Sequence, residues 1–185
     1  METLQHFVER ATEVGARVSG PMTPDEATRQ VVELFLAARA RTALLSPDLN
    51  GLREPIAEAL VRAGAKLVED PAPEAAAQAD AGVSTAVLAV AETGSVVVAG
   101  NDLLPRLATM LPLVHIVLVE QRSLVSSLDE AGDFLRRLTA GEGMPPARNV
   151  SIITGPSRTA DIEKTLSVGV HGPRDLHIVL IQRYR

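Results

Sequence analysis

Short apolar segments alternate with amphipathic segments along most of this 185-residue chain. The apolar runs are rich in valine, leucine and isoleucine, as buried strands are, and the segments between them repeat apolar residues at helical spacing. We expect strands at residues 42–45, 66–68, 83–91, 96–99, 115–119, 150–153 and 177–181. We expect helices at residues 2–18, 23–39, 53–63, 127–138 and 160–166, and one that begins at Asn101 or Asp102. Residues 71–79 fit either a short helix or a surface loop. The alternation predicts an α/β fold with a mostly parallel sheet flanked by helices.

The first 40 residues lie outside this alternation. They contain two predicted helices, joined by a predicted linker at residues 19–23. Thr23 is a suitable N-cap for the second helix, because Pro24 takes the first helical position and Glu26 completes a capping box. We therefore predict an N-terminal helical arm over residues 1–40, packed on the domain or on a partner, and an α/β domain over residues 41–185.

Composition excludes several classes of function. The chain has no cysteine, so it can form no disulfide and offers no thiolate to zinc or to an iron–sulfur cluster. A net charge of −5 and an aromatic content of 2% argue against nucleic acid as a partner. No apolar run reaches the roughly 18 residues of a membrane helix, and the N-terminus lacks the basic-then-apolar order of a secretion signal. We therefore expect a cytoplasmic protein with no nucleic-acid and no membrane partner.

The apolar run at residues 150–153 stops at Thr154, and polar or small residues follow before a helical pattern begins. This order predicts a strand, a tight loop and a helix N-terminus, which is where open α/β sheets tend to bind ligands. The ligand-binding candidates in this segment are Gly155, Pro156, Ser157, Arg158, Thr159, Asp161 and Glu163. The alternative is purely structural: Thr159 caps the helix, and the two carboxylates complement its dipole.

A second polar island, Glu92-Thr93-Gly94-Ser95, interrupts two apolar runs. Gly94 suits a tight turn with positive φ. A carboxylate enclosed between apolar strands is a typical general acid–base or nucleophile. Glu92 is therefore a catalytic candidate, and Thr93, Gly94 and Ser95 are ligand-binding candidates. The alternative is an ordinary surface hairpin with Glu92 at its tip.

A third island, His171-Gly172-Pro173, precedes the last predicted strand. We take His171 as a second catalytic candidate and Gly172 as a ligand-binding candidate. Arg106 lies in the first turn of the helix after residues 96–99, where it either clamps a carboxylate or phosphate in the same crevice or stays solvated. Three such islands in one small domain suggest one site assembled from three loops.

The other histidines are expected to be structural. His115 and His177 each lie at the start of a predicted strand, and His6 lies in the arm. No short His-x₃-His spacing occurs, so we predict no metal site.

At these residues the chain resembles a known family. The segments that carry the resemblance are Ala91–Ser95, Leu111–His115, Gly155–Glu163 and Gly169–Leu180. They are similar to those of the LUD (lactate-utilization) domain, and within that family to the lactate-utilization protein C type. The resemblance is good over residues 80–183 and follows only the general layout before them.

The resemblance implies a fold like that of the NagB/RpiA/CoA-transferase superfamily. It also implies a non-redox role in an iron–sulfur-dependent system that oxidises L-lactate to pyruvate, with a small-anion-binding cleft. Iron–sulfur clusters are then expected on partner proteins, and no cofactor is expected on this chain. The kinship to CoA transferases would make Glu92 the candidate nucleophile. Two alternatives stay open: a stand-alone enzyme acting on a phosphorylated or CoA-linked small acid, and a pure interaction module.

Overall fold

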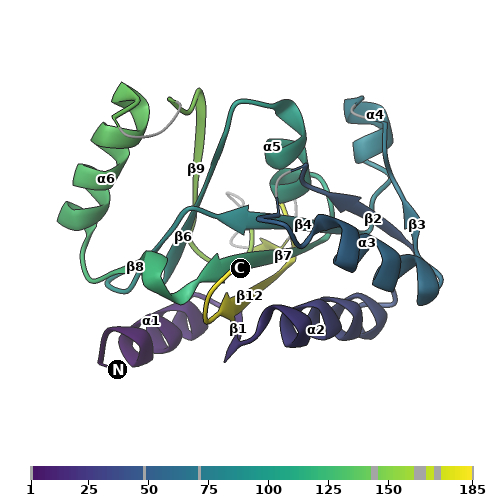
Figure 1. Cartoon of the computed structure of the whole chain (residues 1–185), viewed down its shortest axis with the longest axis horizontal. Helices are drawn as coiled ribbons and strands as arrows, with labels where there is room; N and C mark the ends of the chain where they lie inside the picture. Colours follow the sequence, from purple (N-terminus) through teal and green to yellow (C-terminus); the bar gives the residue numbers. More distant parts are fainter. Residues whose placement is uncertain are drawn as a thin grey trace.

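A parallel sheet forms the centre of the fold (Figure 1). The computed structural model describes residues 2–47, 49–70, 72–142, 146–160, 166–168 and 172–184, and within these residues the sheet has six strands. Their order is β1 (Arg17–Met22), β12 (Asp175–Ile181), β7 (Val114–Glu120), β4 (Ala81–Ala86), β2 (Thr42–Leu45) and β3 (Lys66–Leu67). Because every pairing in it is parallel, all strands start at one edge, the amino edge, and end at the other, the carboxyl edge. The predicted α/β fold class is confirmed.

Two helices cover one face of this sheet, namely α2 (Pro24–Ala37) and α3 (Arg53–Arg62). Their apolar stripes bury Phe35 and Ile56 against Ile116 and Leu118 of β7, and all four side chains are at most 2% exposed. Burial of a large apolar side chain contributes about 1.5–3 kcal/mol. This face therefore holds the larger share of the apolar core around β7.

The opposite face is covered by α1 (Glu2–Glu13), by α5 (Leu103–Met110) with α4 (Pro73–Ala76), and by a second sheet. The second sheet has the order β8 (Leu124–Val125), β5 (Leu88–Val90), β6 (Ser95–Gly100) and β9 (Asn149–Ile153). The short helix η1 (Gln121–Ser123) connects β7 to β8. Phe7 of α1 packs among Val117 and Ile178 of the central sheet and Val96 of β6. Helix α1 thus joins the two sheets.

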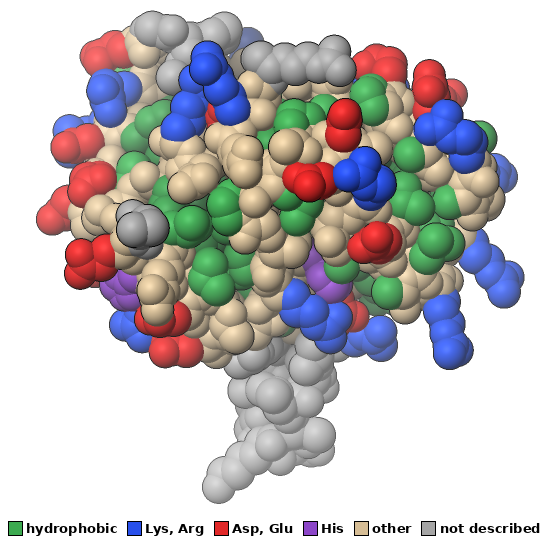
Figure 2. All heavy atoms as spheres, turned by 60° about the horizontal axis from the view of Figure 1, so that its bottom comes forward, with side chains coloured by type: hydrophobic (Ala, Val, Ile, Leu, Met, Phe, Trp, Pro, Cys, Tyr) green, Lys and Arg blue, Asp and Glu red, His purple; other side chains and the backbone are tan. Residues whose placement is uncertain are grey.

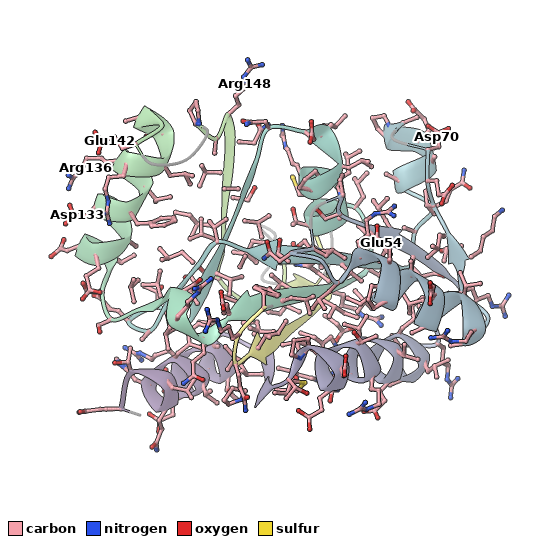
Figure 3. The ribbon with its side chains drawn as sticks, in the orientation of Figure 1. Glu54, Asp70, Asp133, Arg136, Glu142 and Arg148 are labelled. Carbon is pink, nitrogen blue, oxygen red and sulfur yellow. The ribbon has the colours of Figure 1, made fainter. Side chains whose placement is uncertain are left out.

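Helix α6 (Leu128–Ala140) packs on the second sheet, with Ala131 against Val97 of β6. Figure 1 shows it at the far left of the molecule, with α4 at the upper right. Its side chains Asp133 and Arg136 point away from the sheet, as does Glu142 just after the helix (Figure 3).

The helix ends follow the local signals in the sequence. The Thr23 side chain accepts a hydrogen bond from Glu26 N, and the Glu26 side chain accepts one from Thr23 N, so the predicted capping box is present. Gly64 follows α3 with a φ of 92°, as a glycine after a helix should. Ser127 caps α6, accepting from Glu130 N at 3.3 Å. Local chemistry alone sets these boundaries.

Several expectations about helices, strands and linkers are wrong. The helix expected at residues 2–18 ends at Glu13, and Arg17 begins β1. Residues 19–23 are not simply a linker, because β1 pairs in parallel with β12 and adds an edge strand to the sheet. The predicted helical arm is therefore built into the core through β1 and the buried faces of α1 and α2. The predicted strand at residues 83–91 is divided between two sheets, as β4 and β5. Strand β9 belongs to the second sheet and pairs antiparallel with β6.

Candidate functional site

A cleft of about 440 Å³ opens at the carboxyl edge of the central sheet. One wall comes from the ends of β4 and β7 and the loop after β2, and the other from the end of β6 and the loop before α5. The polar residues that line it are Ser46, Asn50, Thr85, Asn101, Asp102, Glu120, Ser123 and Tyr184. Ligands in open α/β folds bind at this edge, so its position makes the cleft the leading candidate site.

Glu120 is the buried carboxylate of this cleft. It ends β7, is only 3% exposed, and has hydrogen bonds at both oxygens. Arg122 donates from Nε to Oε2 at 2.7 Å, and the backbone N–H of Tyr184 donates to Oε1 at 3.1 Å. A buried charge is tolerated only with such partners. The carboxylate is therefore held in a fixed orientation, as acid–base chemistry requires.

The facing wall contributes a second carboxylate. Asp102 is exposed and stands at the N-cap position of α5 without a side-chain capping bond. Beside it, Oδ1 of Asn101 accepts from the backbone N–H of Arg148 at 2.8 Å, which fixes the loop. With hydroxyls from Ser46 and Ser123, the polar groups of the lining are mainly acceptors and hydroxyl groups, and apolar residues such as Val98 and Phe134 surround them. Such a lining favours a ligand that donates hydrogen bonds from hydroxyl groups.

The three polar islands of the sequence do meet. The hydroxyl oxygens of Thr93 and Ser95 lie 2.7 Å apart, and those of Ser95 and Thr154 also lie 2.7 Å apart. The third island joins the first through the backbone N–H of Ser157, which donates to the Pro173 carbonyl at 2.8 Å. These loops, distant in the sequence, therefore contact one another, and the prediction that they form one ligand site stays a prediction.

Helix α1 packs directly on this assembly. A Cβ atom added to Gly94, whose φ is 66°, would lie 2.3 Å from the backbone nitrogen of Ala11. A Cβ added to Gly155, with a φ of 76°, would lie 2.3 Å from the carbonyl oxygen of Val14. Both glycines are thus needed for the close approach of α1 as well as for their turns. Their ligand-binding role stays a prediction.

Glu92 does not lie in a cleft. Its side chain is exposed, and Oε2 accepts a hydrogen bond from the backbone N–H of Leu128 at 2.8 Å. That N–H belongs to the first residue of α6, so the carboxylate stabilises a helix N-terminus. The enclosed position that motivated a catalytic role is absent, and that role stays a prediction.

The helix expected at residues 160–166 is contradicted at both ends of that range, where strand residues stand instead. Strand β10 (Arg158–Ala160) pairs antiparallel with β11 (Leu166–Val168), with Thr159 opposite Ser167. The capping pattern misled because threonine is also a strong strand former, and long-range pairing outweighs a local cap. Asp161, Glu163 and His171 lie outside the described residues, and so do the side chains of Arg158 and Thr159. Pro156 and Ser157 are half-buried, and Gly172 lies next to Ser157.

Arg106 lies away from the place where the three polar islands meet. Its exposed side chain lines a small hollow with Gly100, at the end of β6, whereas Ser95 starts that strand. Five strand residues span roughly 17 Å. The clamp expected from Arg106 is therefore placed far from the hydroxyl cluster.

Of the two histidines buried among the described residues, His115 lies inside the central sheet. His115 is 0% exposed, and its Nε2 lies 2.8 Å from the hydroxyl oxygen of Ser84 on the neighbouring strand. Burial lowers the pKa of His115 to about 3, so the ring is neutral at physiological pH. No group of three or more metal-ligating side chains occurs within the described part of the chain.

The sequence model of one family, the LUD domain, matches residues 4–181. The chain belongs to the LUD domain family. A solved structure agrees with this assignment at the level of the fold: a DUF162 family protein from Deinococcus radiodurans superimposes with a TM-score of 0.69. The two chains are 21% identical, and the match covers 97% of this LUD domain protein and 96% of the other chain.

Several curated proteins that are similar to this chain are named lactate utilization protein C. Lactate utilization protein C of Bacillus subtilis is 36% identical over 106 residues, which are 57% of this chain and 44% of that protein. The protein of the same name from Shouchella clausii is 38% identical over 100 residues, covering 54% and 43% of the two chains. An uncharacterized protein of Neisseria meningitidis is 38% identical over 102 residues, covering 55% and 42%. The matched region spans less than half the length of each relative.

Sequence reasoning missed the cleft of this LUD domain. The signal was present, because Glu120 directly follows an apolar run, as Glu92 does. Asp102 and Tyr184 carried no comparable signal, since only the fold brings them to the end of β7. No helix in the described ranges has the length and apolarity to cross a membrane.

Proposed function

We propose that this protein acts in lactate utilization, as a non-redox component of an iron–sulfur-dependent system that oxidises L-lactate to pyruvate. The observation that carries the proposal is the 36–38% identity to proteins named lactate utilization protein C. Membership of the LUD domain family over residues 4–181 supports it.

The composition of the chain supports the assignment of the iron–sulfur clusters to other proteins of the system. The chain has no cysteine, and cysteine thiolates are the usual ligands of iron–sulfur clusters. In the proposed system the clusters belong to partner proteins in the cytoplasm, and this chain binds no cofactor. Its contribution is then a ligand site or a docking surface for those partners.

The proposed ligand site is the cleft around Glu120. Its own charges are the carboxylates of Glu120 and Asp102, which repel a multiply charged anion. A small hydroxy acid fits better, because its hydroxyl can donate to Glu120 while its single carboxylate accepts from the hydroxyls of Ser46 and Ser123. The Arg122 side chain, 70% exposed beside Glu120, supplies the balancing positive charge. L-lactate has this chemistry.

The second candidate is a stand-alone enzyme acting on a phosphorylated or CoA-linked small acid. The buried carboxylate at the ligand-binding edge of the fold favours it. In this case Glu120 is the general acid–base group, and the purified chain turns over substrate without partners. Turnover that is lost in Glu120→Gln would support this candidate.

Growth on L-lactate tests the first proposal. In a host that lacks the gene for this chain, the wild type should restore growth and should co-purify with cysteine-rich iron–sulfur proteins. Glu120→Gln should fail to restore growth. Glu142→Gln, which changes an exposed carboxylate just beyond the end of α6, should behave as the wild type (Figure 3). Thermal melts of both variants separate loss of the site from loss of the fold. Unchanged growth without the gene, together with no co-purifying partner, would contradict the proposal.

A further inference from the structure

A second hollow, of about 420 Å³, lies at the opposite edge of the central sheet. It is formed where β1, β12 and β7 start and where α2 ends. Its lining residues are Arg17, Leu34, Ala37, Ala38, Arg39, Val114, Arg174, Asp175 and His177. Strand β7 runs from Val114 in this hollow to Glu120 in the carboxyl-edge cleft. Six strand residues separate the two sites by roughly 20 Å.

The hollow has an excess of positive charge. Three guanidinium groups face one carboxylate, and that carboxylate serves two of them. Asp175 lies 3.9 Å from Arg17 Nη2 and 3.3 Å from Arg174 Nε. Arg39 has no ion pair to any described residue. Figure 2, in which the bottom of Figure 1 comes forward, shows a histidine near the middle of the face with Lys or Arg and acidic side chains around it.

Arg39 occupies a strained position. It follows α2 with a φ of 55°, in the left-handed region that L residues avoid. Two other helices place a glycine at the same position, the second residue after the helix: Gly15 after α1 and Gly64 after α3, both with φ of 92°. Gly141, with φ of 75°, directly follows α6. An arginine nearer the helix end would complement the dipole of α2 without this strain. The strained placement therefore points to a use for the Arg39 guanidinium.

His177 contributes a neutral donor to the same hollow. The residue is 6% exposed, and burial, followed by the charge of Arg17, holds the pKa of its imidazole below the usual range. Asp175 acts in the opposite direction but does not reverse the shift. A neutral imidazole can donate one hydrogen bond to an oxygen atom without adding charge.

We propose that this amino-edge hollow binds an oxyanion, the phosphate or carboxylate group of a small molecule, between Arg39, Arg17 and Arg174. Guanidinium groups match the geometry of both oxyanions by donating two parallel hydrogen bonds. The site is separate from the cleft around Glu120, and it stands whether or not the chain acts in lactate utilization.

Calorimetric titration at low ionic strength tests the site, with inorganic phosphate and L-lactate as separate probes. The wild type should bind one equivalent of at least one probe in this hollow, and any L-lactate bound in the cleft around Glu120 would be a second equivalent that Arg39→Gly leaves unchanged. Arg39→Gly should weaken binding in the hollow by roughly tenfold or more, as expected for loss of a charge-assisted contact. Asp175→Asn should strengthen it, because removing the carboxylate leaves Arg17 and Arg174 for the ligand. Tighter phosphate binding would assign a phosphorylated ligand, and tighter lactate binding a carboxylate.

The matched control is Arg62→Gln, which removes an exposed positive charge from α3 and should leave binding unchanged. Without ligand, Arg39→Gly should melt at a higher temperature than the wild type, because glycine adopts the left-handed region freely. Higher stability with weaker binding would show that Arg39 is retained for the ligand. The proposal is wrong if neither probe binds, if Arg39→Gly binds as the wild type does, or if Arg62→Gln weakens binding equally.

Discussion

Ser95 and Thr154 are 59 residues apart in the sequence, yet their hydroxyl oxygens lie 2.7 Å apart. The contact joins the starting end of β6 to the loop after β9, because those strands pair antiparallel. Ser95 also lies 2.7 Å from the Thr93 hydroxyl, and it is 2% exposed. Three hydroxyls in series thus connect two of the polar islands under α1.

A double-mutant cycle can measure this contact. We expect Ser95→Ala and Thr154→Val to show a coupling energy of about 0.5–1.5 kcal/mol in urea unfolding, as for a partly buried hydrogen bond. Thr139→Val, on the exposed surface of α6, is the control partner for Ser95→Ala and should show no coupling. Strict additivity of the Ser95 and Thr154 changes would contradict the contact.

Glycine substitutions should separate backbone strain from steric overlap. Gly94→Ala combines a positive φ with a backbone contact at 2.3 Å, so we expect a loss of more than about 2 kcal/mol. Gly51→Ala has a φ of 81° but open space, so its loss should be about 1–2 kcal/mol. Gly132→Ala, inside α6 with open space, should stabilise the protein by up to about 1 kcal/mol. Urea unfolding measures all three, and a Gly94→Ala loss no larger than that of Gly51→Ala would refute the close approach of α1.

Glu92 should act mainly on α6. Glu92→Gln removes a carboxylate at the helix N-terminus and should cost about 0.3–1 kcal/mol at low salt, with a smaller cost at high salt. Urea unfolding at two salt concentrations checks this expectation. Glu142→Gln, beyond the other end of the helix, should not destabilise the protein. A complete loss of growth on lactate in Glu92→Gln, with stability unchanged, would instead restore the catalytic interpretation.

His115 should make the protein sensitive to acid. Its folded pKa of about 3 lies below the unfolded value of about 6.5, so only the unfolded state gains a proton between these pH values. The free energy of unfolding should therefore fall as pH drops from about 6.5 towards 3, by up to about 1.4 kcal/mol per pH unit from this residue. His115→Leu should remove that part of the slope, whereas the exposed His6→Gln should not. Equal slopes in all three proteins, measured by urea unfolding across this range, would contradict the buried neutral ring.

Signals from neighbouring residues were sufficient to predict most helices and strands. The capping box at Thr23, the glycine after α3 and the Ser127 cap depend on neighbouring residues, so the sequence predicts them directly. Strands β10 and β11 depend on pairing between two segments, and the local pattern at Thr159 indicated a helix instead. The same limit applies to the candidate site. The polar islands could be found by their composition, whereas the cleft at Glu120 needs the ends of several strands to be placed together.

The order of residues by itself determined the α/β class, the family motifs and the ends of α2, α3 and α6, because burial periodicity and capping act over a few residues. Only the tertiary structure decided that α1 packs on Gly94 and Gly155, that β1 completes the central sheet, and that Glu120 rather than Glu92 is the enclosed carboxylate. Whether a charged side chain is buried depends on which distant segments cover it, and no neighbouring residue carries that information.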